Sequence, residues 1–133
     1  MNMEINSLGF IAAITAFLTI WFGHVAVRKI EFISPTIWLP TIVFAAFGIA
    51  TELLSLSTAN RPLSTALGIL GTTLLFDAFE LTRQQKRIIK GHAPANHNNP
   101  RHVRFLAEPN SHVTTLDLLK REPTGKLVNA NQN

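Results

Sequence analysis

Three apolar stretches constrain this chain more than any other feature of its sequence. Residues 8–27 form a run of twenty residues without a formal charge, and residues 37–56 form a second run whose one charged residue is Glu52. A helix needs about 20 such residues to cross the ~30 Å hydrocarbon core of a bilayer. Charged residues make up only 15% of the chain, below the ~25% usual for soluble domains, which favours a membrane protein.

A third apolar stretch, residues 63–81, is weaker because Asp77 and Glu80 interrupt it. Only its first fourteen residues are free of charge, and a run of that length is equally typical of a buried or re-entrant helix. The helical pattern continues to Lys90 and stops at Gly91, and basic residues followed by glycine are a common helix end. Such a helix would be about 42 Å long at 1.5 Å per residue. We therefore predict an all-α integral membrane protein with three transmembrane helices, of which the third is long and projects beyond the bilayer.

The first apolar run could also be read as a cleaved signal peptide, in which basic residues precede the apolar run. Residues 1–7 have no basic residue and include Glu4, whereas Arg28 and Lys29 follow the run. This order is the reverse of that in a signal peptide, and it predicts an uncleaved helix.

The distribution of Lys and Arg predicts how the helices are oriented. The N-terminus and the loop at residues 57–62 share one side and hold only Arg61. The opposite side holds six basic anchors, namely Arg28, Lys29, Arg83, Lys86, Arg87 and Lys90. By the positive-inside rule, the N-terminus lies outside and the C-terminus lies in the cytoplasm.

Basic charge is concentrated in the C-terminal part of the chain. Residues 82–133 carry nine basic and three acidic residues, whereas residues 1–81 carry three basic and five acidic ones. A basic segment beside an apolar body favours anionic lipid headgroups as a partner, and no nucleic-acid partner is predicted.

The C-terminal tail differs from the apolar body in its pattern as well. Residues 91–102 are rich in His, Asn and Pro and have no apolar period, so we expect them to be irregular. Thr114 could cap a short helix that runs through Arg121. Because apolar residues are few, we expect a mostly disordered basic tail over 92–133, after a membrane domain over 1–91.

Several short patterns resemble those of a known protein family. They are Phe22-Gly23-His24, Lys29-Ile30-Glu31-Phe32, Trp38, Leu67-Gly68-Ile69-Leu70-Gly71, Glu80-Leu81 and Lys90-Gly91-x-x-Pro94. Their order and spacing over residues 8–100 resemble a bacterial family of small integral membrane proteins that is classed as a domain of unknown function. The chain differs from it at Val25, where a proline is usual, at Asp77, where a small or polar residue is usual, and in the additional residues 101–133. The resemblance implies three hydrophobic segments and no known activity.

The third helix has two distinct faces when its residues are placed 100° apart. One face is polar and carries Thr73, Asp77, Glu80 and Gln84, and the opposite one carries Ser64, Gly68, Gly71, Thr72 and Leu75. Small residues allow close helix contact, so Gly68 and Gly71 are predicted to be packing positions. A bulky residue there is expected to do more damage than one at Gly48. We expect neighbours on both faces, from this chain and from a second copy.

Three ionisable residues of the apolar region lie at similar depth, namely His24, Asp77 and Glu80. They allow three interpretations. The side chains could reach the headgroups, with Arg83 or Arg28 neutralising the acids. His24 could instead bond one acid across the helices, or the three could relay protons or ions.

Glu52 is the remaining carboxylate within an apolar run. It lies near the outer end of the second run, so we expect it to be exposed to water on that side. Arg61, in the loop that follows, could face it.

Candidate catalytic and metal sites are scarce. The chain has no cysteine, and it contains none of the Gly-x-Ser-x-Gly, His-Glu-x-x-His or phosphate-loop patterns. His92, His97 and His102 recur at five-residue spacing and could bind Zn²⁺. They lie among Asn and Pro without a nearby carboxylate pair, so no metal site and no cofactor are predicted.

The missing site motifs favour a protein that is not an enzyme. The leading hypothesis is a structural or accessory subunit of a larger membrane complex, or a protein that associates with itself. The alternative is an oligomeric component for transport of protons, ions or small solutes, which would use Asp77, Glu80 and His24.

Overall fold

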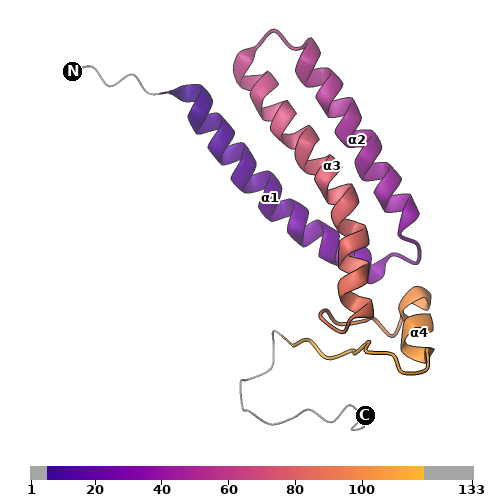
Figure 1. Ribbon diagram of the computed structural model, residues 1–133. Helices are drawn as coiled ribbons and strands as arrows, with labels where there is room; N and C mark the ends of the chain where they lie inside the picture. Colours follow the sequence, from indigo (N-terminus) through magenta and orange to yellow (C-terminus); the bar gives the residue numbers. More distant parts are fainter. Residues whose placement is uncertain (1–5, 119–133) are drawn as a thin grey trace.

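Three long helices dominate the computed structural model, which describes residues 6–118 (Figure 1). Helix α1 covers Ser7–Ile33, α2 covers Trp38–Ser57 and α3 covers Arg61–Ile89, and a short helix, α4, covers Pro100–Ala107. The described part of the chain contains no strand. By length and composition, each of α1, α2 and α3 could cross a membrane. The prediction of an all-α protein with three candidate spans and a long third helix is therefore confirmed.

Helix α3 lies between α1 and α2 and packs against both (Figure 1). Its polar face meets α1, where the hydroxyls of Thr19 and Thr73 are 3.2 Å apart. Its small-residue face meets α2, where the Ser55 hydroxyl donates to the Ser64 carbonyl at 2.8 Å and the Ser64 hydroxyl donates back to the Ser55 carbonyl at 2.9 Å. The two faces predicted for this helix thus each contact a helix of the same chain.

Helix α1 continues beyond the apolar run that predicted it. The run ends at residue 27, whereas α1 ends at Ile33 and is capped by the Ser34 backbone N–H, which donates to the Ile30 carbonyl at 2.8 Å. Arg28 and Lys29 therefore lie on the last turns of a helix and not in a loop. At 1.5 Å per residue, α1 is about 40 Å long and extends past a ~30 Å hydrocarbon core.

Helix α3 ends as the sequence predicts, at a glycine. The Gly91 N–H donates to the Ile88 carbonyl and the His92 N–H donates to the Arg87 carbonyl, at 2.9 and 2.8 Å. This pair of bonds is a Schellman motif, and it requires the left-handed backbone of Gly91, whose φ is 74°. The chain is thereby turned back toward the ends of α1 and α3.

The contact between α2 and α3 is tightest at Gly48, where a bulky residue was expected to do less damage than at Gly68 or Gly71. A Cβ on Gly48 would lie 2.8 Å from Leu75 Cγ and 3.0 Å from the Leu75 backbone nitrogen. A Cβ on Gly71 would lie 2.8 Å from a carboxylate oxygen of Glu52, and one on Gly68 would meet only the Ser55 hydroxyl, at 3.1 Å. Side chains give way more easily than backbone, so Gly48, and not Gly68, is the most restricted of the three.

The first part of the tail is ordered against the bundle, which corrects the expectation of mostly disordered chain. Ile88 packs with two buried alanines, Ala93 and Ala95, and Leu106 and Val113 cover them. The Ala95 N–H donates to the Thr114 carbonyl at 2.8 Å, so two tail segments run side by side.

Two local predictions for the tail are also corrected. Helix α4 begins at Pro100, inside the segment 91–102 that we expected to be irregular, because Asn99 caps it. The helix expected from Thr114 is absent over residues 114–118. The remainder of that predicted helix, and the tail over 119–133, lie outside the described residues.

Candidate functional site

A groove between α1 and α3 brings together two of the three ionisable residues singled out in the apolar region. Its volume is about 480 Å³, and its lining includes Ile20, His24, Ile69, Thr72, Thr73, Phe76 and Asp77. His24 and Asp77 therefore lie on facing helices of the same groove, as their equal depth in the sequence predicts.

Asp77 is buried at the helix contact, with 5% of its surface exposed. Its carboxylate lies directly against Gly23 of α1. A Cβ added to Gly23 would lie 2.7 Å from Asp77 Oδ1 and would overlap Oδ2. The absence of a side chain at Gly23 therefore creates the space that the carboxylate fills. Sequence analysis gave Gly23 no role, and its place in the Phe22-Gly23-His24 pattern was the available signal.

Glu80 is paired within its own helix and not across to α1. Its Oε2 lies 3.2 Å from Nη1 of Arg83, one turn further along α3. The Arg83 side chain is 56% exposed and that of Glu80 is 14% exposed, so the pair lies where the helix leaves the bundle. Within residues 6–118, no hydrogen bond joins the His24 side chain to either acid. The Glu80–Arg83 contact favours the interpretation in which a basic residue neutralises the acid.

Glu52 does not face Arg61, which corrects the expectation from sequence. Its Oε1 accepts a hydrogen bond from the Thr72 hydroxyl at 2.8 Å and lies over Gly71. Gly71 is ten residues into α3, about 15 Å from its start. The carboxylate thus lies halfway along the apolar part of α3, and its hydrogen bond to Thr72 links α2 to α3.

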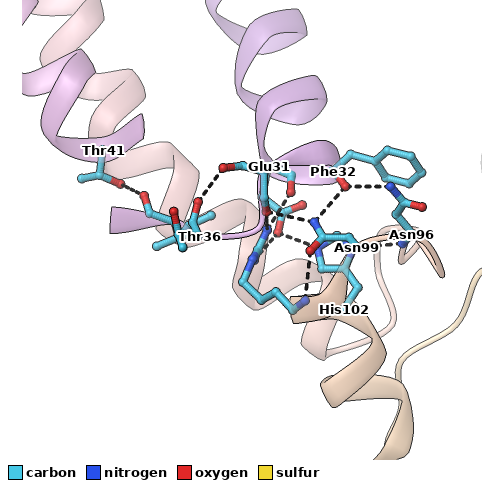
Figure 2. A network of polar contacts seen from close by, with 10 residues as sticks. Glu31, Phe32, Thr36, Thr41, Asn96, Asn99 and His102 are labelled. Carbon is cyan, nitrogen blue, oxygen red and sulfur yellow. Dashed lines mark hydrogen bonds and ion pairs between the residues drawn. The ribbon is translucent and has the colours of Figure 1, made fainter. Parts of the chain in front are cut away.

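A fourth acid, Glu31, is buried at the end of α1 beneath α4. The residue is 0% exposed, and its Oε1 accepts hydrogen bonds from Arg101 Nη1 at 2.8 Å and from His102 Nε2 at 3.1 Å. Figure 2 shows His102 and Asn99 pointing from the α4 side toward Glu31 and Phe32. We call Glu31, Asn99, Arg101 and His102 the Glu31 cap.

The hydrogen bonds of His102 define its protonation state. Its Nδ1 accepts from the Asn96 backbone N–H at 2.9 Å, so Nδ1 carries no proton. Nε2 must then carry the proton and donate it to Glu31. His102 is therefore a neutral donor, and Arg101 supplies the one positive charge that balances the buried carboxylate.

Asn99 joins the ends of two helices through the two halves of its amide. Its Oδ1 accepts from the Arg101 N–H at 3.0 Å and caps the start of α4. Its Nδ2 donates to the carbonyls of Phe32 and Ser34, at 3.0 and 2.9 Å, where α1 ends (Figure 2). Helix ends leave unpaired N–H and C=O groups, and one side chain that is 2% exposed satisfies both kinds here.

This cap was not predicted from the sequence. Glu31 was noted only within Lys29-Ile30-Glu31-Phe32, and His102 only as a candidate metal ligand together with His92 and His97. The described residues contain no group of three or more His, Asp or Glu side chains able to hold a metal ion. The signal that was available is Asn99-Pro100, a capping residue followed by a proline that suits the first position of a helix.

Basic residues gather at the end of the bundle that carries α4. The ends of α1 and α3 contribute Arg28, Lys29, Arg83, Lys86, Arg87 and Lys90, and α4 adds Arg101 and Arg104. We call this end, opposite to the loop between α2 and α3, the basic end.

Comparison with known proteins agrees with the resemblance found in the sequence. No curated protein and no solved structure matches the chain. The model of a family described as a domain of unknown function, DUF4491, matches residues 6–99. The match includes all three long helices and ends at Asn99, so α4 lies just beyond it. Because the match spans well over half of the 133 residues, the chain belongs to the DUF4491 family.

Proposed function

We propose that this protein is a non-catalytic subunit of the bacterial inner membrane, which acts as an accessory part of a larger membrane complex or by associating with itself. The observation that carries the proposal is that three of the four acids of the long helices, all except Asp77, are engaged by protein partners. Glu31 is held by the cap, Glu52 by Thr72 and Glu80 by Arg83. A catalytic acid or base must be free to reach a substrate, whereas these three carboxylates are bound by other side chains of the protein.

The outer flanks of the bundle support association with other helices. Helix α3 lies between the other two helices (Figure 1), and α1 and α2 each carry many exposed apolar side chains. Large exposed side chains include Phe10, Phe17 and Phe22 on α1 and Phe47, Leu53 and Leu56 on α2. In a bilayer such faces are covered either by lipid or by a partner helix that packs against them by van der Waals contact.

Photo-crosslinking in native membranes tests this proposal. A photoreactive residue placed at Phe17 or at Phe47 is expected to give a protein adduct of discrete mass on at least one flank. An adduct with twice the chain mass of 14.7 kDa identifies self-association, and a different discrete mass identifies a partner subunit. Matched probes at Phe76 and Phe79 of α3 serve as controls for non-specific capture. Lipid adducts alone on both flanks would contradict the proposal.

The proposed orientation places the basic end in the cytoplasm and the N-terminus outside. The six anchors on α1 and α3, with Arg101 and Arg104 close by, all lie at one end of the bundle, and the other end carries Arg61. A reporter that is active only in the cytoplasm is therefore expected to be active when it is fused after residue 133. Activity of a periplasmic reporter at the same position would reverse the assignment.

Transport of protons or cations by an oligomer is the second candidate, and Asp77 is the observation that favours it. Asp77 is the acid of α3 without a basic partner on the next turn, and it shares the α1–α3 groove with His24. Under the accessory proposal, the purified protein in vesicles gives no proton or cation flux above that of empty vesicles. Reproducible flux that is lost in Asp77→Asn or Glu80→Gln would favour transport instead.

A further inference from the structure

Two cavities meet at the basic end, in the angle between α1 and α3. One has a volume of about 370 Å³ and the other of about 280 Å³. They share three lining residues, which are Arg28 of α1 and Gln84 and Arg87 of α3. The shared wall therefore includes one arginine from each of the two helices, and Gln84 precedes Arg87 by three residues on α3.

Gln84 is the uncharged polar residue of this shared wall. It is 6% exposed, yet its side chain lines both cavities. Among residues 6–118 its amide has no hydrogen-bond partner. The amide is not among the fully buried polar atoms that lack a partner, so it reaches the open space of the cavities. A ligand oxygen in the cavity would supply the missing partner.

The charge around the cavities favours an anionic ligand. Arg28 uses its Nε to donate to the His24 carbonyl at 3.2 Å, and this leaves its two terminal nitrogens for a ligand. Arg87 makes no ion pair within the described residues. Lys29 and His92 also line the larger cavity.

Three acids face the same space and limit its positive charge. Glu31 is bound by Arg101 at 2.8 Å and Glu80 lies 3.2 Å from Arg83, so both are already balanced. Asp117, which has an interaction of its own, is the third. The single negative charge of Asp117 is outnumbered by the positive charges of Arg28, Lys29 and Arg87, so the walls carry a net positive charge.

The depth of the cavities points to a lipid as the source of the anion. Arg28 follows directly after the apolar run 8–27, and Gln84 and Arg87 follow the run that ends at residue 81. This is the level of the headgroups when the apolar runs fill the hydrocarbon core. The wall of the larger cavity also includes apolar side chains, among them Val25, Phe32, Ile88 and Leu118.

We propose that these cavities bind the phosphate group of an anionic phospholipid, with Arg28 and Arg87 holding the phosphate from two sides and Gln84 donating a hydrogen bond to one of its oxygens. Basic pockets between membrane helices are suited to such headgroups, and guanidinium groups bind phosphate through paired hydrogen bonds. The site does not depend on the accessory role proposed above, since a transporter or a self-associating protein could equally hold a lipid there.

Lipid titration of the full chain in a neutral detergent tests the proposal, with binding followed by native mass spectrometry and by thermal shift. Phosphatidylglycerol is expected to bind and to raise the melting temperature. Phosphatidylcholine with the same acyl chains should bind at least about 10-fold more weakly, because its choline cation faces the basic wall. Inorganic phosphate at equal concentration should give no shift. Equal effects of the two lipids, or saturation by inorganic phosphate alone, would overturn the assignment.

Variants separate a defined site from general attraction to basic residues. Arg87→Met is expected to weaken phosphatidylglycerol binding about 10-fold or more, because it removes charge-assisted hydrogen bonds. The matched control Lys86→Met removes the same charge from the adjacent position, outside both cavities, and should change binding less than about twofold. Gln84→Glu places a negative charge in the shared wall and should abolish binding. Equal losses in Arg87→Met and Lys86→Met would contradict the proposal, and since both residues are exposed, folding is retained in either case.

Discussion

Replacing both bases of the Glu31 cap, Arg101→Met with His102→Leu, is expected to lower the free energy of unfolding by about 3–5 kcal/mol. The reason is that Glu31 is fully buried and would lose every side chain that balances it, and a buried charge left without its partner is strongly destabilising. For a domain of this size the loss corresponds to a fall in melting temperature of about 10 °C or more. Thermal unfolding in detergent micelles, followed by circular dichroism, measures it.

A third substitution shows whether the unbalanced charge is the cause. Adding Glu31→Met to this variant removes the buried carboxylate and should recover more than half of the lost melting temperature, since ion pairs replaced as a whole by apolar residues are often tolerated. The matched control, Arg104→Met with His97→Leu, removes the same two residue types from exposed positions of the same segment and should leave stability unchanged. A loss in the control equal to that in the cap variant would show that the tail contributes by charge alone.

Gly23→Val is expected to be nearly as damaging, because the new side chain would occupy the space of the Asp77 carboxylate. Either α1 moves away from α3 or the carboxylate is displaced from its buried position. Overpacking of this kind costs about 1–3 kcal/mol or more. The same unfolding measurement should therefore show a fall of several degrees.

The pair is tested by a double-mutant cycle. Asp77→Ala in the Gly23→Val background empties the space that the valine needs, so the two substitutions together should be less harmful than their sum. Ala13→Val adds a similar volume to an exposed position of α1 and should have little effect. Strict additivity would mean that Gly23 and Asp77 are not in contact.

The three long helices were predictable because each carries a long apolar run with few charges, even though Asp77 and Glu80 interrupt the third, and runs of this length are typical of helices that span a bilayer. The length of α1 was not, since hydropathy ends at residue 27 while the helix continues through charged residues to Ile33. Those last turns are held by Asn99 and Arg101, which are more than sixty residues away in the sequence. A pattern that is read along one segment cannot contain such a contact.

The acids illustrate the same limit. The position of Glu52 near the end of its own helix predicted exposure to water, but its side chain reaches Thr72, near the middle of α3. Depth along one helix therefore did not predict depth in the bundle. His24 and Asp77 line the same groove because α1 and α3 run in the same direction and end at the same side of the bundle (Figure 1).

The distance in sequence between Glu31 and the bases that bind it has a consequence for biosynthesis. Arg101 and His102 follow Glu31 by 70 and 71 residues. At about 5–20 residues per second, a ribosome makes that stretch in about 4–14 s. Throughout this interval the Glu31 carboxylate and the last carbonyls of α1 lack the hydrogen-bond donors that Asn99 and Arg101 later provide. The Glu31 cap closes only after α2 and α3 have been made, so its closure marks a chain whose helices are all in place.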